Sequence, residues 1–237
     1  FAELLEGIHG GAADNDAAST ARDFHVSGPL TSDLSFEGLS MLKSLMLAQA
    51  QVCYVEKATK DGLKPSVLSK LAVEASKLYD AALTMTRTPT LSAVLDKAWA
   101  AYIEFHKKEY EAWAEFYAAQ GVHQKADETG SGYGEEIARL RRAALAAQAA
   151  ADTATRLKLP SGVLTAMSSL ARKVHAEEAK AIDDNNKIYM NPVPDTSSLA
   201  LPAGALLAKA VAPALTTSPS PPSNANANAN PPPHPAT

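Results

Sequence analysis

Two pairs of side chains in this sequence have the types and spacing needed to bind a metal ion. His106 and Glu109 are three residues apart, as are His175 and Glu178, so each pair would lie on one face of a helix. Two such pairs are the beginning of a ferritin-like di-metal site, but that template needs further inward-facing glutamates, and no HExxH motif is present. We therefore expect no metal and no cofactor.

Other catalytic signatures are also missing from the sequence. Catalysis requires a nucleophile with a base and an orienting group, or a metal with several ligands, and no such set is found. The glycines of GSGYGEE at residues 130–136 follow no predicted strand, which indicates a loop and not a phosphate-binding motif. The single cysteine, Cys53, has apolar helix formers around it, which predicts a small core residue in a reducing compartment. We expect a cytosolic protein that is not an enzyme.

Composition points to one domain followed by a tail. The 237 residues are 46% hydrophobic and 20% charged, and the net charge of -4 is spread along the chain, which argues against nucleic acid as a partner. No stretch approaches the roughly 20 apolar residues that cross a bilayer, and no leader precedes the first helix. Because the chain begins with Phe1, we expect a longer protein upstream.

The pattern of apolar residues predicts helices and no strand. Phe1 to Ile8 have the pattern of the last turns of a helix, and a loop follows over residues 11–34. Pro65, Pro89 and Gly62 mark helix ends, as do the glycines at 121–134. The predicted helices cover residues 35–61, 65–86, 90–120, 134–157 and 160–185, with a polar loop at 121–132.

Two of these helices have wide apolar faces, which other parts of the fold must cover. The helix at 35–61 is apolar almost all round, which predicts a position inside a helical array. The helix after residue 90 has an aromatic stripe at spacings of three and four, which includes His106 and favours a core histidine. We expect Trp99, Tyr110 and Trp113 of this stripe to be buried.

The composition changes after residue 185. Residues 185–202 are rich in Asn, Pro and Asp, which predicts an extended segment on the domain surface. Tyr189 would either pack down as an anchor, which the neighbouring Ile188 and Val193 favour, or be offered to a kinase. Residues 203–237 are dominated by Ala, Pro, Asn and Ser and cannot bury enough apolar area to offset ordering. We expect them to form a disordered tail.

The helix at 65–86 has an apolar surface wider than one packing seam. Leu68, Ala72, Ala75, Tyr79 and Ala82 form one face, and Val67, Leu71, Leu78 and Met85 form a second stripe rotated by roughly 80°. Either a third helix covers the second stripe, or part of it, partly exposed beside Tyr54, lines a groove for a partner's amphipathic helix. Periodicity alone leaves both alternatives open.

Three segments of the sequence resemble the BRO domain family. They are SLMLAQAQVCYVEKATKDGLKPSVLSKLA at residues 44–72, YGEEIARLRRA at 133–143 and IYMNPVPD at 188–195, in the order in which the family has them. The resemblance implies an all-α, tetratricopeptide-like antiparallel helical array, the later part of a boomerang-shaped domain. Residues 1–202 would form this portion, without the N-terminal half, and residues 203–237 the tail.

The resemblance also implies a function. It implies a protein-binding adaptor of the ESCRT pathway, cytoplasmic and recruited to endosomes, that docks the C-terminal amphipathic helix of Snf7-type ESCRT-III subunits in endosomal sorting or membrane budding. The family's partner-binding positions fall on Tyr54, Val67 and Leu71 of this sequence. No small-molecule substrate is implied, and late-domain binding, a property of a further domain, is not expected.

Two alternatives stay open. The first is an adaptor in ambient-pH signalling, a role found in the same family. The second is a helical-repeat or membrane-surface scaffold without ESCRT-III binding, for which Lys57, Lys60, Lys64, Lys70 and Lys77 would supply a basic face. Scattered lysines on helices are more often simply solvated.

Overall fold

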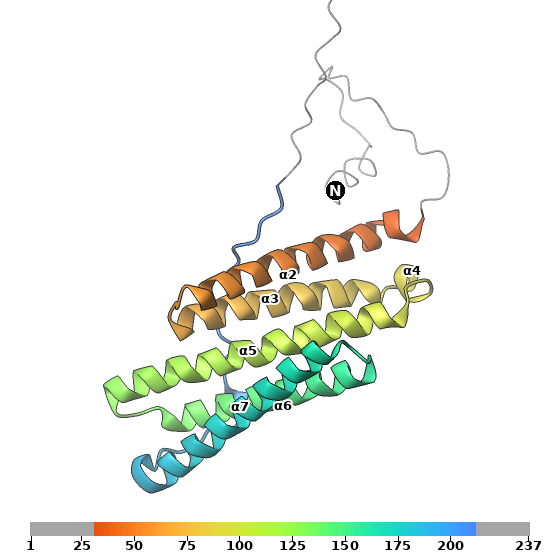
Figure 1. The fold of residues 1–237 in the computed structure, drawn as a ribbon. Coiled ribbons are helices and arrows are strands. Elements are labelled where there is room, and N and C mark those ends of the chain that lie inside the picture. The colour runs from red at the N-terminus through yellow and green to blue at the C-terminus, as the bar shows by residue number, and fades with distance from the viewer. Residues whose placement is uncertain (1–30, 212–237) are drawn as a thin grey trace, which may run out of the picture.

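The computed structural model describes residues 31–211, and within them every regular element is a helix (Figure 1). The predicted helix end at Phe1–Ile8, most of the following loop, and residues 212–237 of the predicted tail lie outside the described residues. The elements are η1 (Ser32–Leu34), α2 (Phe36–Lys60), α3 (Pro65–Thr86), α4 (Pro89–Ser92), α5 (Lys97–Thr129), α6 (Tyr133–Arg156), α7 (Ser161–Asp184), η2 (Asn185–Tyr189) and η3 (Thr196–Ser198).

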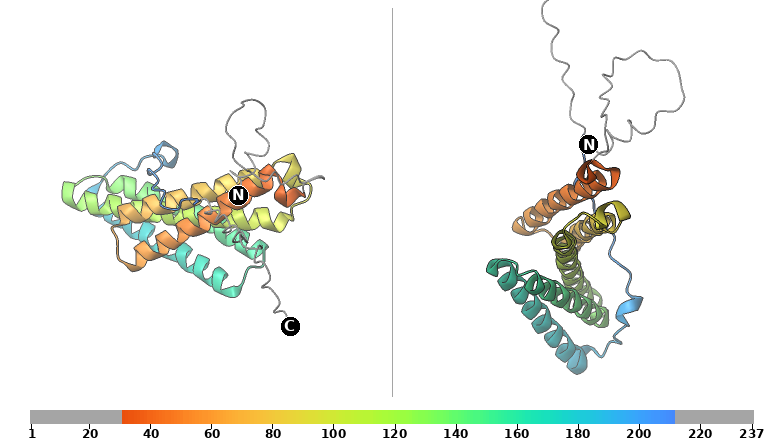
Figure 2. Two further views of the ribbon diagram at one scale, coloured as in Figure 1. Left: turned by 90° about the horizontal axis from the view of Figure 1, so that it is seen from above. Right: turned by 90° about the vertical axis from the view of Figure 1, so that its right-hand side faces the viewer.

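The long helices stack in chain order. α2 packs on α3, α3 on α5, α5 on α6 and α6 on α7. The end-on view at the right of Figure 2 shows this succession, and the colour gradient in Figure 1 shows that each helix reverses the direction of the one before. The prediction of an all-α, antiparallel helical array is confirmed. No helix among residues 31–211 is both long and apolar enough to cross a membrane.

Local signals in the sequence set the helix ends. The Ser35 hydroxyl accepts a hydrogen bond of 3.1 Å from the backbone N–H of Gly38, and the Asp96 carboxylate accepts one of 2.8 Å from that of Ala98. Pro65 occupies the first turn of α3, where its missing N–H costs nothing. Gly62 has φ +68°, the left-handed conformation predicted for the residue that ends the α2 region.

The core combines alanines on facing helices with a few large side chains. Fully buried alanines let neighbouring helices approach closely, and Phe105, Phe116, Ile103, Ile137 and Leu140 fill the space between them. The alanines with no exposed surface are Ala48, Ala72, Ala75, Ala82, Ala112, Ala138, Ala143, Ala147, Ala150 and Ala154.

Several expectations from the sequence are wrong. The predicted loop at 121–132 is helical up to Thr129, because its polar residues are good helix formers and Ala126 packs inward. Trp99 is 47% exposed, because it lies in the first turn of α5 at the edge of the stack. Cys53 is exposed, since the neighbouring positions Gln51 and Val55 take the buried side of α2.

Beyond η2, residues 190–208, here called the C-terminal segment, run along one side of the stack from α7 towards α2 (Figure 2, right). The extended surface segment predicted for residues 185–202 is present from residue 190, after the helical turn of η2. The predicted tail begins too early, because Ala208 is 3% exposed and the backbone N–H of Ala205 donates to the carbonyl of Lys70 at 3.0 Å. The packed part of the chain therefore extends to Ala208.

Candidate protein-docking surface

Gln51 of α2 ties the C-terminal segment to the α2/α3 hairpin. Its side-chain Nε2 donates to the carbonyls of Leu71, at 3.2 Å, and Ala205, at 2.8 Å. Its Oε1 accepts from the backbone N–H groups of Leu207, at 3.0 Å, and Ala208, at 3.1 Å. A primary amide has two N–H donors and two acceptor lone pairs, so all four positions of this buried side chain are used.

Two arginines of α6 bind the C-terminal segment at Leu199 and Ala200, before the Gln51 attachment. Arg139 and Arg142 each bond one carboxylate oxygen of buried Glu115, at 3.1 and 3.0 Å. Arg142 also donates to the carbonyl of Leu199 at 3.2 Å, and Arg139 to that of Ala200 at 3.4 Å. Burial raises the pKa of the Glu115 carboxyl above its usual range, and Arg142 and Arg139 oppose that shift.

A third attachment fixes the start of the segment. The Asn191 side chain accepts from the backbone N–H of Gly132 at 2.8 Å, and Asn185 and Asn191 exchange two hydrogen bonds of 3.0 Å each. A β-carbon at Gly134 would collide with the carbonyl of Pro192, so the first turn of α6 needs a glycine there.

These three attachments give the signature sequences a physical meaning. The buried glutamine of LAQAQ is Gln51, which bonds Ala205. GEEIARL supplies Gly134, which leaves room for Pro192, and Arg139, which bonds Ala200. NPVPD lies at the start of the segment that these residues fasten. Their shared task in this structure is to fasten the C-terminal segment across the helices, a long-range relationship that spacing in the sequence does not reveal.

The three predicted docking residues separate into two groups. Tyr54 of α2 and Val67 of α3 are 42% and 39% exposed, close to the turn that joins the two helices. Leu71 is 3% exposed, so its expected partial exposure is wrong. It belongs to the core cluster that includes Ala48, Val55 and Ala75, because small residues let α2 and α3 pack closely. We call Tyr54 and Val67 the hairpin surface.

The other members of the second stripe are also packed. Leu78 and Met85 are partly buried against the core. A neighbouring helix therefore covers most of the stripe, as the first alternative expected, and only its Val67 end is open.

In each of the two candidate metal pairs the histidine lies beside its glutamate. His106 Nδ1 lies 2.9 Å from Glu109 Oε2, and the imidazole stacks on Tyr79 with centroids 5.2 Å apart, inside the aromatic cluster. His175 Nδ1 lies 3.7 Å from Glu178 Oε2, and Glu178 also accepts from Arg141. Among residues 31–211 no three metal-binding side chains come together.

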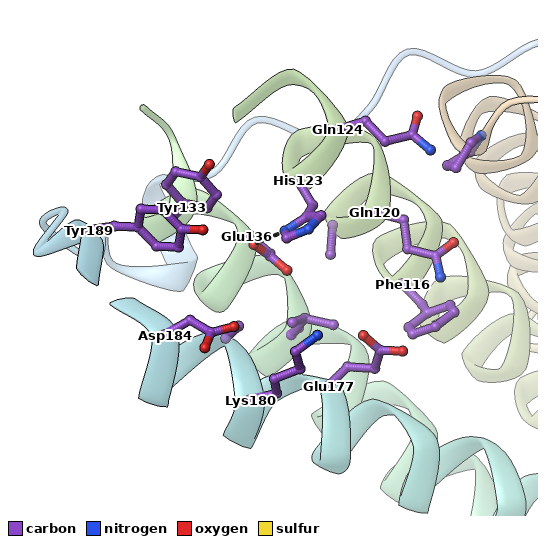
Figure 3. Close-up of a pocket in the computed structure, with 14 residues that line it drawn as sticks. Phe116, Gln120, His123, Gln124, Tyr133, Glu136, Glu177, Lys180, Asp184 and Tyr189 are labelled. Atoms are coloured by element: carbon purple, nitrogen blue, oxygen red, sulfur yellow. Dashed lines mark hydrogen bonds and ion pairs between the residues drawn. The ribbon is translucent and has the colours of Figure 1, made fainter. Parts of the chain in front are cut away.

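A cavity of about 300 Å³ between α5, α6 and α7 was not predicted (Figure 3). His123 and Glu136 face each other in it at 2.9 Å, and Tyr133 and Tyr189 stack at one end with centroids 3.5 Å apart. Burial acts to lower the pKa of His123, but Glu136 raises it above its usual value. His123 was not predicted as a site residue, because residues 121–132 were expected to form a loop.

Tyr189 is half-buried and packs as an anchor, as expected.

The stack and the fastened segment define an all-α helical array with a C-terminal segment packed along one side. Residues 16–232 match the family of BRO1-like domains. The chain belongs to that family, as its signature sequences predicted.

The relatives of this chain include fungal and plant proteins. The pH-response regulator protein palA/RIM20 of Pyricularia oryzae is 30% identical over 224 residues, which cover 87% of this chain and 25% of that protein. Vacuolar-sorting protein BRO1 of Arabidopsis thaliana is 32% identical over 182 residues, covering 76% of this chain and 21% of that protein. The chain thus spans about a quarter of the length of these relatives.

Solved structures of ALIX have the same fold. ALIX in complex with the SIVmac239 PYKEVTEDL late domain matches with a TM-score of 0.70 and 28% identity, over 82% of this chain and 26% of that one. The ALIX BRO1 domain in complex with CHMP4C matches with a TM-score of 0.68 and 28% identity, over 78% of this chain and 48% of that one.

Proposed function

We propose that this chain is a protein-binding adaptor of the ESCRT pathway whose hairpin surface docks the C-terminal amphipathic helix of a Snf7-type ESCRT-III subunit. The observation that carries the proposal is the exposure of Tyr54 and Val67, two apolar side chains at the partner-binding positions that the BRO resemblance assigns. The complex of the ALIX BRO1 domain with the ESCRT-III subunit CHMP4C supports this choice of partner.

The three docking residues have different parts in this proposal. Tyr54 and Val67 contact the partner helix and lose their exposed apolar surface to it. Leu71 is the packed floor beneath them, and its carbonyl is bonded to Gln51. It acts by keeping α2 and α3 in place.

Charge around the hairpin surface favours an acidic partner helix. Lys57 is paired with Asp61 and Lys77 with Glu74. Within residues 31–211, exposed Lys64 and Lys70 have no acidic partner within ion-pair distance. A helix with acidic side chains beside its leucines fits this rim, and such charges mainly raise the association rate and the specificity.

The test is titration of a C-terminal helix peptide of CHMP4C into the full 237-residue chain. Val67→Asp should weaken binding at least tenfold while circular dichroism stays unchanged, because the exposed position tolerates a charge until a partner closes over it. Leu145→Asp is the matched control, since Leu145 is an exposed apolar residue on α6. Equal affinity of the two variants would reject the proposal.

We propose cytoplasmic localisation with recruitment to endosomes, through this same docking. A tagged chain should co-localise with an endosomal marker, and Tyr54→Asp should disperse it. Dispersal by Leu145→Asp as well would show that recruitment does not use the hairpin surface.

Ambient-pH signalling is the second candidate, favoured by the similarity to palA/RIM20 proteins. Vacuolar sorting and ambient-pH signalling predict different outcomes of a complementation experiment in a fungus. Replacing the corresponding part of palA/RIM20 by this chain should restore growth at alkaline pH if the chain serves pH signalling, and should fail if it serves only vacuolar sorting.

A further inference from the structure

We propose that His123 is a protonation-dependent latch. When its imidazole is protonated, it fastens the C-terminal end of α5 to the first turn of α6, and when the imidazole is neutral, the end of α5 loosens. The latch lies in the cavity between α5, α6 and α7 (Figure 3), apart from the hairpin surface. It is a regulatory device that the proposed function does not require.

Both ring nitrogens of His123 face a carboxylate. Nδ1 lies 2.9 Å from Oε2 of Glu136 on α6, and Nε2 lies 3.6 Å from Oδ2 of Asp127, one turn further along α5. A neutral imidazole has one N–H and one lone pair, so in either tautomer it turns a lone pair towards one of the two carboxylates. Only the protonated ring, with two N–H groups, suits both carboxylates. The geometry therefore favours the imidazolium form.

Asp127 links the histidine to the two stacked tyrosines. Its Oδ1 accepts a hydrogen bond of 3.1 Å from the hydroxyl of Tyr133, and the Tyr133 ring stacks on Tyr189 with centroids 3.5 Å apart. Tyr189 ends η2, directly before the C-terminal segment. When His123 loses its proton, Asp127 loses the opposite charge beside it, and the acceptor of the Tyr133 hydroxyl is held less firmly. The latch therefore acts on the start of the C-terminal segment as well.

The end of α5 has little other packing. Among residues 121–130 only Ala126 is buried. Gly130 then ends the helix in the left-handed conformation, with φ +71°. A segment with few buried apolar contacts opens locally at a low cost in free energy. The charge on one bridging histidine should therefore change how often this segment opens.

Charged groups from every neighbouring helix face His123. Glu136 begins α6 and Asp127 belongs to α5 itself. The cavity lining adds the charged side chains of α7, which are Glu177, Lys180 and Asp184 (Figure 3). Burial acts to lower the pKa of His123, but Glu136 and Asp127 raise it above its usual value, and Lys180 opposes them. The surroundings as a whole favour the protonated ring.

The pH dependence has a defined sign. Burial raises the pKa of the Glu136 carboxyl above its usual range, and the bond from His123 opposes that shift. Because both pKa values are raised, the folded chain binds protons more tightly than the unfolded chain, and acidification from pH 8 to pH 6 closes the latch. The His123 side chain is 44% exposed, so solvent screens the interaction and the change is severalfold and not all-or-none.

The experiment is hydrogen-exchange mass spectrometry of the full 237-residue chain at pH 6 and pH 8, with rates corrected for the intrinsic pH dependence of exchange. Protection of residues 121–133 should be about threefold higher at pH 6, and residues 185–191 should change in the same direction. His123→Gln keeps a polar side chain that does not titrate, so it should remove the difference between the two pH values. Circular dichroism checks that this variant is folded.

Two further variants should shift the latch in opposite directions. Asp127→Asn removes a carboxylate that favours the imidazolium, so the midpoint of the His123 titration, followed by NMR, should move to lower pH. Lys180→Gln removes an opposing charge, so the midpoint should move to higher pH. Protection of residues 121–133 should follow each midpoint. Asp127 and Lys180 are both exposed, so both variants should stay folded.

Three results would overturn the latch. Equal protection of residues 121–133 at the two pH values in the wild type would show that protonation does not control the end of α5. A pH difference that persists in His123→Gln would assign it to another group. Titration midpoints that move in the same direction in Asp127→Asn and Lys180→Gln would show that these charges do not act on His123. None of the measurements uses a partner, so the latch and the proposed function are tested independently.

Discussion

The Nε2 atom of Gln51 donates a 2.8 Å hydrogen bond to the carbonyl of Ala205, which lies 154 residues further along the chain. This bond attaches the end of the C-terminal segment to α2. The segment is therefore part of the domain.

Gln51→Leu should detach the end of the segment. The substitution leaves four backbone groups without their partner, and each unsatisfied buried group costs about 1–3 kcal/mol, less where water reaches it after release. Cleavage by trypsin after Lys209 should accelerate, and the melting temperature should fall. Gln49→Leu is the control, because Gln49 is exposed in the same motif. Equal trypsin sensitivity of the two variants would contradict the attachment.

Gly134→Ala should destabilise the domain, since the added methyl group meets the backbone of Pro192 and neither backbone can move freely. We expect a loss of about 1–3 kcal/mol, the usual cost of overpacking. Gly162→Ala provides the contrast. A β-carbon at Gly162 meets nothing within 4 Å, and alanine is the better helix former, so that variant should be as stable as the wild type or more so. Urea unfolding of both variants measures the difference.

Stability should depend on the protonation of His123. The pKa of His123 is raised in the folded state, so its contribution is fully present below its unfolded value of about 6.5 and is lost as the pH rises through the folded value. His123→Gln should flatten the melting temperature between pH 6 and pH 8 relative to the wild type. A slope that survives His123→Gln would show that another group causes it.

The two tryptophans of α5 should differ in their energetic contributions. Trp113 is partly buried and stacks on Tyr117 with centroids 5.4 Å apart, so Trp113→Ala should cost about 3 kcal/mol. Trp99→Ala should cost less than about 1 kcal/mol, because Trp99 is largely exposed. Denaturant titration of the two variants tests the assignment, and similar losses would place Trp99 in the core.

Helices with strong end signals were predictable from the sequence. The bounds of α3 were predicted correctly because Pro65 begins it and Pro89 follows its end. The helical extension at 121–129 was missed because only Ala126 of its polar stretch is buried, so no apolar period was visible. Val67 and Leu71 are both aliphatic and lie on one stripe of α3. Only the packing of α2 decides that Leu71 is buried and that Val67 is exposed.

The fastened segment could not be derived from spacing, because its bonds join residues far apart in the chain. A signal was nevertheless present at Gln51. It lies between Ala48 and Val55 on the buried side of α2, and a polar side chain on an apolar face needs hydrogen-bond partners from elsewhere in the fold.

Hydrogen-exchange mass spectrometry with and without the CHMP4C C-terminal helix peptide tests the central claim most directly, because it locates the docking surface without a chosen mutation. The account predicts slower exchange of the amides around Tyr54 and around Val67, with α6 and α7 unchanged. Protection confined to α6 and α7, with none at the hairpin surface, would contradict it.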